Sequence, residues 1–242
     1  IDFAETNRTH FAADEAVSLD VYVKNAPTLI VKVFEINTTN FYRDFGREVN
    51  TDIDLDGLVA NSEETIKYAE PPLRRVRRHF EFPQLSGRGT YVIDFIGNGH
   101  SSRALIRKGQ LRFVVSTTPA GQKFRVFDEN RKAAESATVR LGGQEYESDA
   151  DGTVIVPFST SPGQRAVIIS ANTFSTLGHF QHLAESYELR AGILVDRQSL
   201  LRLRKAKVIV RPQLLLNGTP VSLALLKNVR LDITSLNHDE VS

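Results

Sequence analysis

The sequence predicts an all-β fold of consecutive antiparallel β-sandwiches with few short helices, and three observations support this prediction. Apolar and polar residues alternate, as in residues 15–23, where Val17, Leu19 and Val21 share one face of a strand. The tetrapeptide GNGH at 97–100 is typical of a tight hairpin turn. Short β-branched runs separated by Gly-containing turns recur at close spacing along the chain.

These strands divide the chain into three predicted units. In residues 1–109 we expect strands at 15–23, 29–36, 74–82, 89–97 and 101–108. In residues 110–186 we expect them at 110–115, 122–129, 137–143, 144–149, 153–158 and 163–170. In residues 187–242 we expect them at 187–200, 206–216, 220–226 and 228–235, and this short unit is predicted to be a truncated sandwich.

Helical signals are few. Ser62, followed by acidic residues and then Pro71, predicts a short helix over 62–70, and residues 176–187 are a second candidate for a helix or turn. The predicted core follows from the alternation in the strands. It consists of Val17, Leu19, Val21, Ile30, Val33, Phe80, Phe82, Tyr91, Ile93, Phe95, Leu105, Val126, Val139, Ile155, Val167 and Ile169.

Composition excludes several classes of function. Hydrophobic residues make up 41% and charged residues 24%, with a net charge of +1, which argues against a nucleic-acid or anionic-membrane binder. Without cysteine there is no disulfide, no thiolate nucleophile and no cysteine-based zinc site. No apolar run is long enough to span a bilayer, so we expect no membrane insertion. The lack of methionine indicates a mature product or an excised piece.

Residues 52–63 are the strongest candidate for a metal site. Asp52, Asp54 and Asp56 precede Gly57, and Glu63 stands at the last position of an EF-hand calcium loop. The alternation D-I-D-L-D, however, is typical of a half-buried strand, and helices on both sides are not evident. We expect a strand here, and keep as the alternative a calcium-stiffened adhesin or surface binding module with these carboxylates as ligands.

Other candidate sites have simpler interpretations. His179 and His182 have helical spacing, with Glu185 nearby, but lack the H-E-x-x-H pattern of zinc hydrolases. The acidic stretch 149–152 is expected to be a β-turn. The basic runs 73–79 and 201–207 alternate with apolar residues and lack interleaved aromatics, so a solvated strand face is expected rather than nucleic-acid binding. No nucleophile elbow or Walker A pattern occurs, and no enzyme is expected.

Three longer phrases carry a resemblance to a known family: RRHFEFPQLSGRGTYVIDFIGNG, RALIRKGQLRFVV and VRLGGQEYESDADGTVIVPF. They resemble the N-terminal macroglobulin-type domains of bacterial alpha-2-macroglobulin-like proteins, and the last is also similar to small sandwich modules appended to carboxypeptidases and adhesins. The resemblance implies Ig-like or macroglobulin-like sandwiches. The thioester motif of the family needs a cysteine, so that chemistry is not carried over.

The predicted function is therefore a non-catalytic structural and interaction module of a larger exported protein, a protease-trap scaffold. The resemblance implies neighbouring domains of the parent protein as partners, with a protease or another protein as target. It also implies a secreted, periplasmic or cell-surface location. No cofactor is expected, apart from calcium under the alternative.

Overall fold

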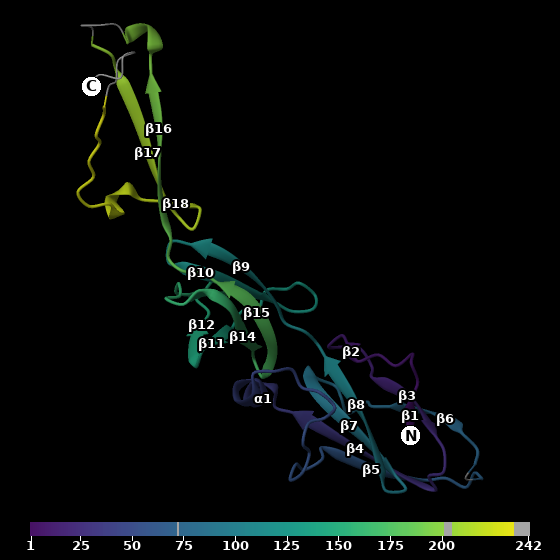
Figure 1. Cartoon of the computed structure of the whole chain (residues 1–242). Helices are drawn as coiled ribbons and strands as arrows, with labels where there is room; N and C mark the ends of the chain where they lie inside the picture. Colours follow the sequence, from purple (N-terminus) through teal and green to yellow (C-terminus); the bar gives the residue numbers. More distant parts are fainter. Residues whose placement is uncertain (72, 201–204, 235–242) are drawn as a thin grey trace. The chain divides into compact units, whose positions relative to one another are not determined.

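The computed structural model describes residues 1–71, 73–200 and 205–234. Within these ranges the chain forms two compact units, the first from residues 1–116 and 121–183 and the second from residues 117–120 and 184–234 (Figure 1). The predicted all-β fold of tandem sandwiches is confirmed. The domain boundaries expected after residues 109 and 186 stay predictions. No helix in the described ranges has the length and apolar character needed to cross a bilayer.

The first sandwich of the first unit contains two sheets (Figure 1). Its strands are β1 (Asp2–Phe3), β2 (His10–Phe11), β3 (Ser18–Val23), β4 (Thr28–Ile36), β5 (Ser62–Lys67), β6 (Val76–Glu81), β7 (Gly89–Gly97) and β8 (His100–Lys108). We call β1-β3-β6 the smaller sheet and β2-β8-β7-β4-β5 the larger sheet. The pairings are antiparallel except that of β2 with β8.

The core of this sandwich is centred on Phe95 of β7, which is fully buried. The rings of Phe3, Phe80 and Phe82 lie edge-on to it, with centroids 5.6, 5.1 and 6.5 Å away. Edge-to-face contacts suit the charge distribution of aromatic rings. The hairpin between β7 and β8 turns at Asn98 and Gly99, which have φ of 50° and 75°, as the sequence predicted.

The second sandwich follows in the same unit. Its strands are β9 (Arg112–Thr118), β10 (Gly121–Phe127), β11 (Ala137–Leu141), β12 (Gln144–Glu147), β13 (Thr153–Val156), β14 (Gly163–Ala171) and β15 (Phe174–His182). The sheets have the orders β13-β10-β9 and β12-β11-β14-β15. Phe124 and Phe180 meet edge to face in the core, 4.9 Å apart. Residues 149–152 form the predicted turn, closed by a hydrogen bond from the Gly152 amide to the Asp149 carbonyl.

A helix that the sequence did not predict, α1 (Thr38–Phe45), follows β4. The side chain of Asn37 accepts a hydrogen bond from the Asn40 amide at its start. Gly46 ends it with φ of 62°, and its amide donates to the Tyr42 carbonyl. We call the chain from α1 to β5, residues 38–61, the crossover.

The two helices expected from sequence are wrong. Residues 62–70 begin with β5, which pairs with β4, and residues 176–182 lie in β15, which pairs with β14 along its length. Ladder hydrogen bonds to a neighbouring strand outweighed the local N-cap signal of Ser62. The strand expected at 52–57 is also wrong, because this stretch is irregular and contains turns.

The predicted core residues are buried, with two exceptions. Ile30 and Ile155 are half-buried, because their neighbours Leu29, Val31 and Val154 point into the core instead. In a strand, consecutive side chains point to opposite faces, so an assignment displaced by one residue inverts the face.

The second unit contains β16 (Tyr187–Val195), β17 (Val208–Leu216) and β18 (Thr219–Val221), in the order β16-β17-β18. Two short 3-10 helices, η1 (Arg197–Ser199) and η2 (Leu223–Leu225), belong to it. The hairpin between β17 and β18 turns at Asn217 and Gly218, both with positive φ. Part of the basic run at 201–207, residues 201–204, and residue 235 of the last expected strand lie outside the described residues. The rest of that strand, 228–234, is irregular.

Candidate functional site: a joint between two sandwiches

The acidic residues proposed as calcium ligands are not brought together. Asp52, Asp54 and Asp56 lie in the crossover, whereas Glu63 lies in β5 opposite Lys32, with its Oε2 3.2 Å from the Lys32 Nζ. The Asp54 carboxylate accepts the amide of Asp56, which closes a local turn. Among residues 1–71, 73–200 and 205–234, no three His, Asp or Glu side chains form a group that could hold a metal ion.

A positive charge also occupies the inner side of this loop. Arg103 of β8 donates from Nη1 to the carbonyl of Ile53 at 2.8 Å, and its Nε lies 3.6 Å from Oδ2 of the buried Asp94. Arg107, also in β8, donates to the carbonyl of Val49 at 2.7 Å. Two guanidinium groups thus hold the crossover on the larger sheet, and their charge opposes a cation at the same carbonyls.

Beneath these arginines, the outer face of the larger sheet is buried in a hydrophobic cluster that joins the two sandwiches. We call it the joint cluster. Its buried members are Phe34, Ile36, Phe41, Tyr42, Val49, Ile53, Leu55, Val92, Leu105 and Ile168. Ile168 lies in β14 of the second sandwich, and Leu177 of β15 packs against the cluster. In Figure 1, α1 lies beside β14 and β15, so the crossover is the layer between the sandwiches.

Hydrogen bonds accompany this apolar contact. The Oγ1 of Thr39 in α1 lies 2.5 Å from the Oγ of Ser175 in β15, and that Oγ lies 2.7 Å from the Oγ of Ser170. Thr38 Oγ1 donates to the Ser175 carbonyl at 3.4 Å. Thr38 and Ser175 are both buried, so their polar groups are satisfied within the joint. Burial raises the pKa of Tyr42, and so does the nearby Glu48 carboxylate, to which its hydroxyl donates.

An ion pair connects the two sandwiches at a second point. Arg88 precedes β7, and its Nη2 donates to Oε1 of Glu129 at 2.8 Å and to Oδ2 of Asp128 at 3.4 Å. Burial alone would raise the pKa of Glu129, but the hydrogen bonds from Arg88 and the amide of Gln110 outweigh it and hold that pKa below its usual value. Gln110 lies in the short link between β8 and β9, so the hydrogen bond from its amide to Glu129 also attaches this link to the second sandwich.

The sequence contained weak signals for this joint. Asn37 and Gly46 are typical caps, and the run GTYVIDFIG places apolar residues on both faces of a strand. Strands buried on both faces have such continuous runs. Nothing in the sequence, however, indicated that Arg88 and Glu129 would meet across forty intervening residues.

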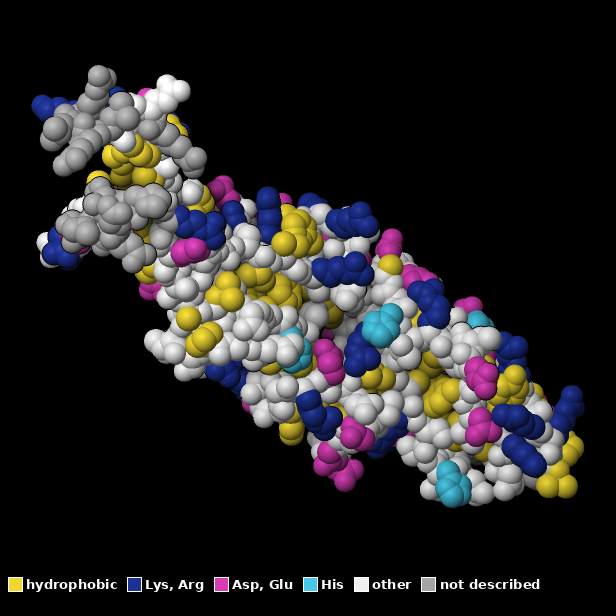
Figure 2. All heavy atoms as spheres, turned by 45° about the horizontal axis from the view of Figure 1, so that its top comes forward, with side chains coloured by type: hydrophobic (Ala, Val, Ile, Leu, Met, Phe, Trp, Pro, Cys, Tyr) yellow, Lys and Arg dark blue, Asp and Glu magenta, His cyan; other side chains and the backbone are white. Residues whose placement is uncertain are grey.

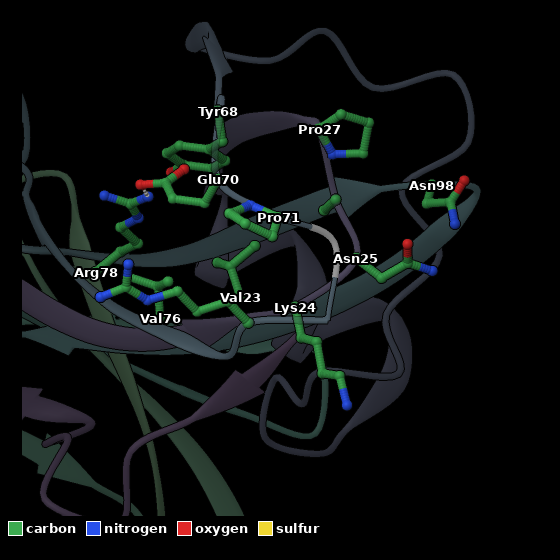
Figure 3. A pocket seen from close by; sticks show the side chains of 12 residues that line it. Val23, Lys24, Asn25, Pro27, Tyr68, Glu70, Pro71, Val76, Arg78 and Asn98 are labelled. Carbon is green, nitrogen blue, oxygen red and sulfur yellow. Dashed lines mark hydrogen bonds and ion pairs between the residues drawn. The ribbon is translucent and has the colours of Figure 1, made fainter.

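A pocket of about 210 Å³ lies in the first sandwich, away from the joint cluster, and is lined by residues that include Val23, Tyr68 and Arg78 (Figure 3). There the Arg78 guanidinium stacks on the Tyr68 ring, 4.3 Å from its centroid, and pairs with Glu70. Burial raises the pKa of Tyr68, and the hydrogen bond from Arg78 lowers the pKa of Glu70. Arg78 and Glu70 pair with each other through Nη2 of the arginine, while the buried Nε of Arg78 has no hydrogen-bond partner.

The remaining candidate residues have structural surroundings. His179 and His182 lie on β15 at odd spacing, so they project from opposite faces of the strand, and His182 Nε2 lies 2.9 Å from the Pro157 carbonyl. In the basic run 73–79, Arg77 and His79 both contact the carboxylate of Asp20, at 2.6 and 3.0 Å. The hydrogen bond from Arg77, followed by that from His79, lowers the pKa of Asp20.

Further pairs of opposite charge occur on the surface. Figure 2 shows positive and negative side chains interspersed over the face that it draws. Arg8 pairs with Glu15, and Arg75 with Asp2. With a net charge of only +1, the chain as a whole produces little long-range field.

The fold and its joint define a class of protein: a tandem of immunoglobulin-like β-sandwich domains. Residues 29–109 match the family of the AbpF first immunoglobulin-like domain, and residues 196–242 match that of the AbpF third immunoglobulin-like domain. Actin-binding protein F of Dictyostelium discoideum is 40% identical over 247 aligned residues, covering 99% of this chain. The chain spans 10% of the length of that curated relative.

Solved structures are more distant. Native alpha-2-macroglobulin from Escherichia coli is 15% identical, with a TM-score of 0.43, covering 72% of this chain and 62% of that one. A chimeric titin Z1Z2 tandem is 12% identical, with a TM-score of 0.36, covering 76% of this chain and 99% of that one.

These comparisons correct two predictions. The matching families are AbpF immunoglobulin-like domains, so only the sandwich type implied by the alpha-2-macroglobulin resemblance stands, and the protease-trap scaffold has no support. The secreted, periplasmic or cell-surface location is wrong, because it rested on that resemblance alone, and the relative is named for binding actin. The calcium-stiffened adhesin is likewise unsupported.

Calcium is expected to leave the stability of the protein unchanged. A ligand that binds the native state must raise the melting midpoint, and Arg103 and the dispersed carboxylates disfavour such binding. Thermal melts in millimolar calcium and in EDTA should therefore coincide. A higher midpoint in calcium that disappears in an Asp52→Asn variant would contradict this.

Replacing Glu129 with glutamine should destabilise the chain by about 1 kcal/mol at pH 7, because it weakens a partly buried, charge-assisted pair with Arg88. The folded pKa of Glu129 lies below its ordinary value of 4.5. The contribution of the Glu129 carboxylate to the free energy of unfolding is therefore fully present above about pH 4.5, and it is lost as the pH falls through the folded pKa.

Urea unfolding of wild type and Glu129→Gln at pH 7 and at more acidic pH measures this difference. The exposed Glu147→Gln is the matched control and should behave as wild type at both pH values. If the difference in free energy of unfolding between wild type and Glu129→Gln grows as the pH is lowered, the proposed role of the Arg88–Glu129 pair is contradicted.

Proposed function

We propose that the first unit of this chain is a non-catalytic, rigid spacer within a larger actin-binding protein of the AbpF type, in which the two sandwiches keep a fixed orientation. The observation that carries the proposal is the joint cluster, in which Ile168 of the second sandwich is buried against the crossover of the first. Domains joined only by a flexible linker move relative to one another, whereas an apolar interface restrains them.

The polar groups of the joint support a structural role. Thr39 and Ser175 are hydrogen-bonded to each other, and Arg88 is engaged by Glu129 and Asp128. A catalytic group has to be available to a substrate, and these side chains are committed to holding the joint.

Actin is part of the proposal because the 40% identical relative is named as an actin-binding protein. The low net charge of +1, together with pairs such as that of Asp20 with Arg77 and His79, favours spacing over direct filament contact for this segment. Contact with actin is therefore proposed for other parts of the parent protein.

The absence of cysteine allows a direct measurement of rigidity. Spin labels at Lys24→Cys in the first sandwich and Ser136→Cys in the second would be the only labels in the chain. Pulsed electron resonance should give a narrow distance distribution. Ile168→Ser should broaden it, because the serine removes apolar contact from the joint while the core of the second sandwich, which does not include Ile168, stays intact.

The control carries Val114→Ser, which changes an exposed valine of β9 and should leave the distribution narrow. Circular dichroism should show the same strand content in all variants. A broad distribution in the otherwise wild-type pair would refute the rigid spacer.

In cosedimentation with actin filaments at physiological ionic strength, the chain should remain in the supernatant, because its paired surface charges supply no strong attraction. Saturable pelleting that depends on filament concentration would show that the segment contacts actin itself and is more than a spacer.

A further inference from the structure

An open apolar groove lies between α1 and the rest of the crossover. It has a volume of about 520 Å³, within the range of binding pockets for small ligands and side chains. Ile36, Phe41 and Ile53 are among the residues that line it, and all three are buried members of the joint cluster. The floor of the groove is therefore part of the buried joint cluster.

Two large apolar side chains line the groove without being covered. Phe45, in the last turn of α1, is 62% exposed, and Leu58 is 49% exposed. Next to Leu58, Val59 is 90% exposed. The Phe45 ring contacts the ring of Phe41 at 4.7 Å, so it is held in place beside the groove. Exposed apolar side chains gathered at one pocket are typical of an interaction site.

The charges around the groove indicate the chemistry of its partner. Glu35, Asp44, Asp52 and Asp54 line it, against one basic lining residue, Arg47. The Arg47 guanidinium lies 5.6 Å from the Phe41 ring and 3.6 Å from the Asp52 carboxylate, and the Arg43 Nε lies 3.1 Å from the Asp44 carboxylate. Both ion pairs are exposed, and exposed ion pairs are weak. Four carboxylates against these two guanidinium groups leave an excess of negative charge around an apolar groove, which favours a partner with the opposite charge.

We propose that this groove docks a short basic segment of another polypeptide. One apolar side chain of that segment lies in the groove between Phe45 and Leu58, and Lys or Arg residues on either side of it face Asp44 and Asp52. The acidic stretch that resembles a calcium loop is then part of a peptide-binding rim. This inference is independent of the spacer function, because no residue of β14 or β15 is among those that line the groove, and Phe45 and Leu58 are exposed.

The test uses the full chain and a set of fluorescent peptides. Each has a central Leu, Ile, Phe or Trp flanked by two lysines on each side, and a matched set has glutamates in their place. Fluorescence polarisation should show binding of lysine-flanked peptides, weakening with added salt, and no binding of the glutamate-flanked set.

Two variants probe the two parts of the site. Phe45→Ser should abolish binding, because it removes the exposed ring beside the groove. The pair Asp44→Lys with Asp52→Lys should weaken binding about tenfold by reversing two rim charges. Asp54 is left unchanged, because its carboxylate accepts the Asp56 amide and holds the turn.

Matched controls are Val114→Ser and the pair Asp14→Lys with Asp151→Lys, which alter exposed residues elsewhere in the first unit and should bind as wild type does. Failure of every lysine-flanked peptide to bind overturns the proposal. So does equal binding of the glutamate-flanked set, or binding that Phe45→Ser leaves intact. Self-association of the chain that Phe45→Ser abolishes assigns the groove to a second copy and also overturns it.

Discussion

The structure of the first unit depends on burial of both faces of the larger sheet. One face packs on the smaller sheet around Phe95, and the other is covered by the crossover and by Ile168 of the second sandwich. A sandwich domain ordinarily exposes its outer faces to water, so its outward residues are polar. Here Phe34, Val92 and Leu105 are apolar on that face, and leaving them exposed would cost roughly 1.5–3 kcal/mol for each side chain.

This constraint orders the rest of the first unit. Arg103 and Arg107 hold the crossover by its carbonyls, and Arg88 holds Glu129 beside the link between the sandwiches. A stretch that resembles a calcium loop therefore serves as a covering layer with its carboxylates turned to solvent. The same layer produces the groove beside α1, so the buried joint between the two sandwiches and the open groove arise from one segment.

Sequence reasoning succeeded where local rules decide the structure. The hairpin at Asn98 and Gly99 needs positive φ at both positions, and Asn-Gly supplies it. It failed where a distant partner decides. Residues 176–182 form a strand because they pair with the edge of β14 that β11 does not occupy. Ile30 and Ile155 face outward because the register of a strand is set by the whole sheet. The helix α1 was missed although its caps, Asn37 and Gly46, are both typical.

By itself the sequence determined an all-β chain of sandwich modules without cysteine chemistry, because alternation and turn residues act over a few neighbouring positions. Only the tertiary structure decided that Glu63 pairs with Lys32 away from Asp52, and that Ile168 closes the joint against α1. Contacts between residues far apart in the chain leave no local pattern. They are set by which apolar faces remain to be covered once each sheet has formed.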